Sequence, residues 1–257
     1  MKPLLIVSIF APSDLNQKWY SLQKRFIAKT TRISYDYRII LNGADTTVFD
    51  SKDILLNNGD NLGHSHALMQ VVNYFRENPY DAYLILDSDC FPVWEGWHDV
   101  LLEQMQKFGK RFAAPVRAEN LDAFPHPSAF FATAEGIRHP GLDFARHESV
   151  NLLGDKVVEV GGAMQAMNEH FLPLVRTNTL NVHPVAAGIY HHLFYHHGAG
   201  SRDFNFRILK RYDYYQHWFD NENREAQCRD LLNALMQDPD GFIQRLMHEQ
   251  PRKCFWK

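Results

Sequence analysis

The stretch Tyr83-Leu84-Ile85-Leu86-Asp87-Ser88-Asp89 decides the fold of this chain. Its run of apolar residues predicts a strand buried on both faces, which is typical of a parallel sheet covered by helices. Two carboxylates follow the run directly, and ligands of open α/β sheets bind at the carboxyl ends of the strands. We therefore expect an α/β fold with a functional site around Asp87 and Asp89.

The segments on either side of this strand alternate between strand-like and helix-like patterns. Further strands are expected over residues 4–10, 35–41 and 112–116 and, as a short strand, within residues 48–56, whereas residues 126–133 fit either a strand or a bent loop. Helices are expected over residues 14–29, 62–75, 97–108, 161–171, 222–236 and 241–248. This alternation indicates βαβ units and a mostly parallel central sheet flanked by helices. Residues 138–153 lack strong periodicity, and no linker or repeat divides the chain, so we expect a single domain over residues 1–257.

Composition excludes several classes of protein. The chain has 257 residues, 45% of them hydrophobic, which is ample for a core. Its 27 Lys and Arg against 30 Asp and Glu give a net charge of −3, which argues against a general nucleic-acid binder. No apolar run approaches the roughly 18 residues of a membrane span. Three scattered cysteines form neither a disulfide framework nor a zinc motif, so we expect a reducing, cytoplasmic compartment.

Asp87 and Asp89 are the strongest candidates for a metal site. Carboxylates one residue apart at a strand-to-loop transition can turn toward one hard cation. Mg²⁺ or Mn²⁺ there would keep open positions for the phosphate oxygens of a substrate. The alternative is that both residues only form a turn or cap a helix.

Two other polar segments favour the binding of phosphate or metal. Residues 58–67 form a glycine-bearing turn at an expected helix start, where backbone N–H groups favour anions. Within it, His64 and His66 lack the i, i+4 spacing of joint metal ligands on a helix. Residues 195–202 combine adjacent histidines with Gly-x-Gly and an arginine, which suits a loop over a diphosphate. An ordinary capped loop and exposed loop histidines are the respective alternatives.

Taken in chain order, these pieces resemble the GT-A superfamily of nucleotide-sugar glycosyltransferases, especially its family-2-like bacterial enzymes. The matching pieces are residues 4–10, Asn42-Gly43, residues 58–67, Asp87-Ser88-Asp89 and residues 195–202. The resemblance covers about residues 3–205. It implies a GT-A fold with a nucleotide-binding half over about residues 1–95, an acceptor half over 96–210 and C-terminal helices over 211–257.

The resemblance also implies roles for single residues. Asp87 and Asp89 would hold Mn²⁺ or Mg²⁺ against the donor diphosphate, and His196, or His197 in its place, would add a further metal or diphosphate contact. The implied donor-binding residues lie within the matching pieces: Ser8, Phe10, Asn42, Asn58, Asn61, Gly63, Ser88 and Arg202. The implied activity is transfer of a hexose from a nucleotide-diphosphate donor to a glycan or lipid-linked acceptor in bacterial surface glycan synthesis.

The chain departs from the inverting family-2 enzymes in one respect. Those enzymes present a Glu-Asp or Asp-Asp pair in the second half as catalytic base, and this chain has none there. The candidates are Asp143, Glu148, Asp155 and Glu159. Glu159 fits best because it ends a short apolar run just before two glycines, and Asp155 is the runner-up. A retaining mechanism without a dedicated base stays open.

Two other functions use the same residues. A haloacid-dehalogenase-type phosphatase would use Asp87 as its nucleophile, but that pattern requires Thr or Val where Cys90 stands. A nucleotide-sugar-binding protein without turnover is the other alternative. The basic and aromatic residues 252–257 could add a peripheral contact at the inner membrane, although six residues contribute little binding energy. The sequence does not indicate an oligomeric state.

Overall fold

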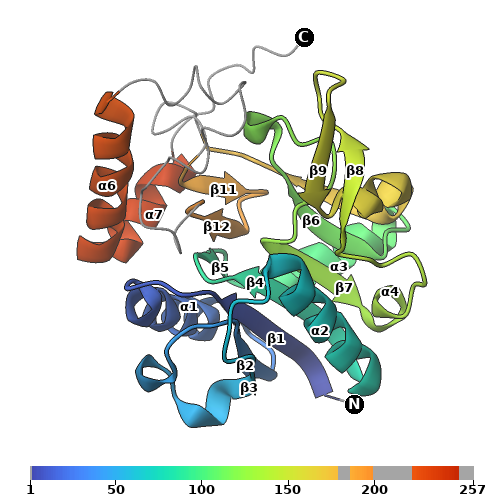
Figure 1. Ribbon diagram of the computed structural model, residues 1–257, viewed down its shortest axis with the longest axis horizontal. Coiled ribbons are helices and arrows are strands. Elements are labelled where there is room, and N and C mark those ends of the chain that lie inside the picture. The colour runs from blue at the N-terminus through green and yellow to red at the C-terminus, as the bar shows by residue number, and fades with distance from the viewer. Residues whose placement is uncertain (1, 179–185, 199–221, 249–257) are drawn as a thin grey trace.

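The computed structural model describes residues 2–178, 186–198 and 222–248, and a central sheet of seven strands runs through it (Figure 1). The strand order is β10-β6-β7-β4-β1-β2-β3. In chain order these strands are β1 (Lys2–Phe10), β2 (Tyr35–Leu41), β3 (Ile54–Asn57), β4 (Tyr80–Asp87), β6 (Phe112–Val116), β7 (Ala129–Thr133) and β10 (Phe171–Val175). Paired strands are parallel, except that β7 is antiparallel to both β4 and β6. The expected mostly parallel α/β sheet is confirmed.

The largely apolar sequence of strand β1 follows from its place between two layers of helices. Leu4 and Ile6 belong to the core on the side of α1 (Asn16–Thr30), whereas Leu5 and Val7 belong to the core on the side of α2 (His64–Glu77). Side chains alternate between the two faces of a strand, so a strand covered by helices on both faces is mostly apolar, and Ser8 is the buried polar residue of this one.

Other helices extend both layers. The core on the α1 side also takes residues from α3 (Trp97–Lys107), α6 (Glu222–Gln237) and α7 (Pro239–His248). The core on the α2 side takes residues from α4 (Ala134–Ile137) and the 3₁₀ helix η4 (Gly162–His170). Three short 3₁₀ helices, η1 (Thr46–Val48), η2 (Ser51–Asp53) and η3 (Ala118–Asn120), lie in connections.

Two small antiparallel sheets complete the described fold. One joins β5 (Cys90–Pro92) to β12 (Phe194–His196), which in turn pairs with β11 (Gly188–Tyr190). It brings the segment after Asp89 beside residues about one hundred positions later in the chain. The other is the hairpin of β8 (Arg146–Val150) and β9 (Lys156–Val160), which stands apart from the main sheet in Figure 1.

Most expected elements are present, although several of their bounds and types differ from the expectation. Helix α1 begins at Asn16 rather than Asp14, and α2 begins at His64 rather than Leu62, directly after Gly63 with its φ of 89°. Residues 161–171, expected as an α-helix, form the 3₁₀ helix η4. Residues 138–153 contain β8, which the pattern did not reveal because four of its five residues are exposed. In the part of the chain that the structure describes, no helix is long and apolar enough to cross a membrane.

Candidate metal centre

The site lies where parallel strands end at one edge of the sheet. Asp87 is the last residue of β4, and its backbone pairs with Ile9 near the end of β1. Its N–H donates to the carbonyl of Ser128, which fixes the point where β4 leaves the sheet. Asp89 follows two residues later and is buried, just before β5. The strand-to-loop transition therefore brings both carboxylates to this edge, as the sequence predicted.

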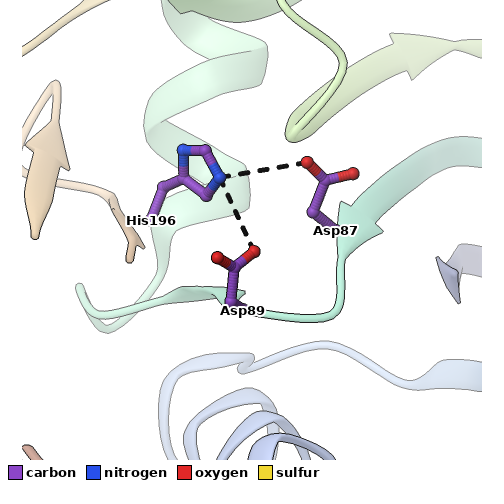
Figure 2. Close-up of side chains that lie close together, drawn as sticks. All are labelled: Asp87, Asp89 and His196. Atoms are coloured by element: carbon purple, nitrogen blue, oxygen red, sulfur yellow. Dashed lines mark ion pairs between the residues drawn. The ribbon is translucent and has the colours of Figure 1, made fainter. Parts of the chain in front are cut away.

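The third residue of the site is His196, which lies more than one hundred positions after Asp89 in the sequence. In the ladder between β5 and β12, His196 lies opposite Cys90, and the N–H of His197 donates to the carbonyl of Asp89. This pairing places Nε2 of His196 3.6 Å from Oδ1 of Asp89 and 3.9 Å from Oδ2 of Asp87. Figure 2 shows the His196 ring facing both carboxylates.

These three side chains fit a divalent cation. Asp87, Asp89 and His196 each offer one ligand atom, and the three atoms lie within 4.8 Å of one another. Two carboxylate oxygens and an imidazole nitrogen form a mixed donor set that suits Mn²⁺ and other first-row divalent ions, and Mg²⁺ through the carboxylates. The Asp87 side chain is 18% exposed, so an ion held there could also reach a ligand from solvent.

Histidines surround Asp87. Nε2 of His64, the first residue of α2, lies 2.9 Å from Oδ1 of Asp87. The ring of His126 stacks on that of His196, with the two centroids 6.0 Å apart. Burial opposes ionisation of Asp87, but the neighbouring imidazoles, first of all His64, hold the pKa of this carboxyl well below its usual range. An ionised carboxylate is the form that binds a cation.

His197 does not face this site. Its Nδ1 lies 2.6 Å from the hydroxyl of Tyr195, and its ring lies 5.2 Å from that of Trp19 in the core. Successive residues of a strand point to opposite faces, so only one of the two adjacent histidines can face the carboxylates. The structure places His196 there, and His197 stabilises the packing of α1.

Four of the expected donor-binding residues have buried side chains: Ser8, Phe10, Asn42 and Ser88. Ser8 and Phe10 are fully buried in β1, where Phe10 packs against Phe49, so neither side chain can contact a donor in this conformation. Ser88 is also buried, between the two site carboxylates in sequence. Strand β1 is covered on both faces, so any donor contact of Ser8 or Phe10 would use the backbone, and their assignment to the donor stays a prediction. Arg202 and residues 252–257 lie outside the described residues.

The asparagines form a network of their own. Asn42 Nδ2 donates to Oδ1 of Asn61 and to the carbonyl of Gly63, and its Oδ1 accepts from Asn58 Nδ2 and the N–H of Leu62. Asn42 follows β2 and is buried, whereas Asn61 and Gly63 are exposed. The network holds the loop before α2 against the end of β2, which fixes the start of the helix.

The candidate bases lie on the β8–β9 hairpin or next to it. Asp155 is exposed at the hairpin turn, where its N–H and Oδ2 bind the side chain of Asn151. Glu159 lies half-buried on β9, opposite His147. Glu148 is paired with Lys156, and Asp143 lies 3.0 Å from His147. Glu159 and Asp143 are thus partly buried, whereas Glu148 and Asp155 are exposed.

A second charged cluster lies at the same edge, beyond the ends of β6 and β10. Nε of Arg117 lies 2.7 Å from Oδ2 of the buried Asp122. Nearby, Arg176 and Glu119 form a buried ion pair, and the hydroxyl of Tyr190 donates to Glu119. Burial raises the pKa of Asp122 to about 6 despite the pairing with Arg117, and the charges of Glu159 and Glu119 add to the rise.

From the sequence, His64 was considered only as a joint ligand with His66 and was not assigned to the site, and no role was assigned to His126 or Asp122. A usable signal existed for His64, because it opens a helix after a glycine turn and helix starts gather at the same sheet edge as Asp87. Asp122 follows a predicted strand by six residues, and the same edge rule applies to it. For His126, only the tertiary contact with His196 reveals its place.

Comparisons with known proteins add little to this geometry. No protein-family model and no curated protein matches the chain. The solved structures that resemble it include a protein from Desulfovibrio desulfuricans G20 described as a nucleotide-diphospho-sugar transferase, and A197 from STIV. The first is 10% identical over 68% of this chain and 80% of its own, with a TM-score of 0.43. The second is 13% identical over 68% and 82%, with a TM-score of 0.36. With TM-scores below 0.5, neither likeness supports a conclusion about this chain.

Proposed function

We propose that this chain is a metal-dependent glycosyltransferase of the GT-A type, which moves a sugar from a nucleotide-diphosphate donor to an acceptor hydroxyl. The observation that carries the proposal is the convergence of Asp87, Asp89 and His196 at the carboxyl edge of a mostly parallel sheet. The order of sequence motifs that resembles this superfamily supports it. We further propose a single domain, a cytoplasmic location with peripheral membrane contact, and a glycan or lipid-linked acceptor.

The proposed reaction exchanges one bond at the anomeric carbon. The bond from this carbon to the diphosphate oxygen breaks, and its electron pair leaves with the nucleoside diphosphate. The acceptor oxygen bonds to the same carbon, and its proton passes to a carboxylate of the protein if the enzyme inverts. A divalent cation held by Asp87, Asp89 and His196 would neutralise charge on the departing diphosphate.

The surroundings of the site suit a diphosphate. Helices α1 and α2 both start from connections that follow parallel strands ending at this edge, and helix N-termini favour phosphate groups. We propose that Asn58, Asn61, Gly63 and Ser88 lie along the donor, with Asn42 holding the loop in place. Arg202 remains a proposed diphosphate contact.

The acceptor base is proposed among the carboxylates of the second half. Glu159 stays the first candidate and Asp155 the runner-up, although Asp155 is exposed and bound within its turn. Asp122 joins them, since it is buried, electrostatically coupled to Glu159, and has a pKa of about 6. A base works best when its pKa lies near the working pH.

One observation bears on the phosphatase alternative. In the described residues, the third potential ligand beside Asp87 and Asp89 is the imidazole of His196, whereas a phosphatase of that type completes its magnesium site with acidic residues. The arrangement therefore favours a metal-bound diphosphate over a phosphoenzyme at Asp87. A binding protein without turnover would use the same site.

A set of nucleotide sugars tested with and without Mn²⁺ discriminates these functions. A glycosyltransferase will be stabilised by one donor in a thermal shift and will hydrolyse it slowly, only with metal. Asp87→Asn should lose both effects, and Asp81→Asn, at the exposed start of the same strand, should keep them. Hydrolysis of phosphomonoesters, or full turnover with excess EDTA, would contradict the proposal. Donor binding without turnover would instead support the alternative of a nucleotide-sugar-binding protein.

A further inference from the structure

The two carboxylate oxygens of Asp87 face different partners. Oδ1 lies 2.9 Å from Nε2 of His64, and Oδ2 lies on the side of His196. We infer that His64 is a positioning residue for the metal centre: its imidazole holds one oxygen of Asp87 and leaves the other to bind the cation as a single ligand atom. This inference rests on the metal centre of the proposed function, not on the reaction assigned to it.

The contact has the geometry that such a role requires. A ligating carboxylate is usually hydrogen-bonded through its other oxygen, and this bond fixes its orientation and tunes its affinity for the metal. The His64 side chain is 35% exposed and that of Asp87 18%, so the bond forms at the mouth of the site and not in the core. A hydrogen bond to a charged group at 2.9 Å is also among the stronger ones in proteins.

The position of His64 is specified from two sides. Before it, Gly63 adopts a φ of 89°, and the carbonyl of Gly63 accepts from Asn42. After it, the hydroxyl of Ser65 donates to the carbonyl of Phe144, in the second half of the chain. A histidine at the first position of a helix, held at both neighbours, presents its ring to Asp87 with little freedom to turn away.

Through His64, the asparagine network also affects the metal centre. Asn42 and Asn58 hold the loop that ends at Gly63, and so they act on Asp87 through His64. The loop between β3 and α2 therefore stabilises the cation site by positioning His64, whether or not the side chains of the loop contact a donor. Since Oδ1 of Asp87 is occupied in this way, the site supplies three protein ligand atoms and keeps the remaining coordination positions for a diphosphate.

Manganese alone is the probe that tests the inference, because its binding can be read without any activity. Electron paramagnetic resonance counts free Mn²⁺ during a titration of the full chain without nucleotide. His64→Ala should weaken the affinity for Mn²⁺ by roughly 10- to 100-fold, the usual loss on removing a partner of a ligand. His64→Gln should recover most of it, because the amide nitrogen of Gln reaches about where Nε2 of His lies.

The matched control is His66→Ala, which removes an exposed histidine from the same turn of α2 and should leave the affinity unchanged. Urea unfolding of each metal-free variant confirms that the fold is retained. Equal affinity of His64→Ala and wild type would overturn the inference, and so would an equal loss in His64→Gln, which would make His64 a direct ligand. Wild type that binds no Mn²⁺ would remove the metal centre itself. Binding that depends on His64 without sugar transfer would refute only the proposed reaction.

Discussion

Asp87 and Asp122 are two carboxylates at one edge of the same sheet, and their surroundings act on them in opposite directions. Histidines surround Asp87, and the nearest, His64, helps to hold its pKa well below the usual range. Burial raises the pKa of Asp122 to about 6, and the nearby Glu159 adds to the rise. When environments separate two carboxyl groups in this way, one suits a cation and the other a proton.

The difference arises from where the neighbours come from. The partners of Asp87 arrive from the start of α2, the connection before β7 and strand β12, and all are histidines. The neighbours of Asp122 include other carboxylates beside a single close arginine. The proposed function assigns the cation to the Asp87 side of this edge and the accepted proton to the Asp122 side, and variants on either side test that proposal.

The largest effect is expected from the ligands of the cation. Asp87→Asn and Asp89→Asn should each reduce Mn²⁺-dependent donor binding and sugar transfer to below detection, because a hard cation needs anionic oxygen ligands. Isothermal calorimetry with Mn²⁺ and a donor measures this. Asp122→Asn serves as the contrast and should leave Mn²⁺ affinity near that of wild type; a comparable loss there would erase the distinction between the two sides.

The next effect concerns the proton-accepting side. If Glu159 is the base, Glu159→Gln should lower kcat by roughly 10²- to 10⁴-fold while donor affinity stays near wild type, since a general base acts in the transition state. Steady-state kinetics with saturating acceptor checks this. A normal kcat in Glu159→Gln together with a loss in Asp122→Asn or Asp155→Asn would transfer the role to that residue. Normal rates in all three would indicate a retaining mechanism.

Asp122 should also make stability depend on pH. Its pKa rises from 3.8 to about 6 in the folded protein, so the folded state binds this proton more tightly than the unfolded state does. Its contribution to the free energy of unfolding is therefore largest below pH 4 and is lost as pH rises through 6. At about 1.4 kcal/mol per pKa unit, the loss amounts to about 3 kcal/mol.

Urea unfolding of wild type and Asp122→Asn at pH 5 and pH 7.5 measures this contribution. The amide cannot titrate, so the stability of the variant relative to wild type should rise between these two pH values. The difference in the free energy of unfolding between wild type and the variant does not include the titration of the site histidines, because both proteins contain them. A difference between the two proteins that does not change with pH would show that Asp122 is not buried against like charges.

The smallest expected effect is a change in the pKa of Asp122, compared with that of Asp87, when Glu159 loses its charge. Glu159 raises the pKa of Asp122 through its charge, so Glu159→Gln should lower the pKa of Asp122 slightly and leave that of Asp87 unchanged. Carbon-13 NMR titration of the aspartate carboxyl groups resolves both. An equal displacement of the two pKa values would mean that the two sides of the edge are electrostatically one site.

The sequence predicted the central features of the fold and the two carboxylates of the metal centre, and the family resemblance added His196 with His197 as its alternative. Strands β2 and β6 were predicted to the residue, because both are short segments rich in apolar and aromatic residues, and Asn42-Gly43 marks the end of β2. Asp87 and Asp89 were predicted because both follow directly on an apolar run. The hairpin strand β8 was missed because its exposed residues carry no alternation of burial. The side chains of Ser8 and Phe10 are buried in β1, so their predicted contact with the donor, which stays a prediction, would use the backbone.

The sequence by itself determined the parallel sheet and the two carboxylates at its edge, because periodicity and strand ends are local properties of the chain. Only the tertiary structure decided which histidines join them. His196 reaches Asp87 and Asp89 through the pairing of β12 with β5, whose register turns His196 toward the carboxylates and His197 toward the core. The opposite pKa shifts of Asp87 and Asp122 likewise depend on burial and on charges brought from distant segments. A contact between residues about one hundred positions apart follows from packing, and no local pattern encodes it.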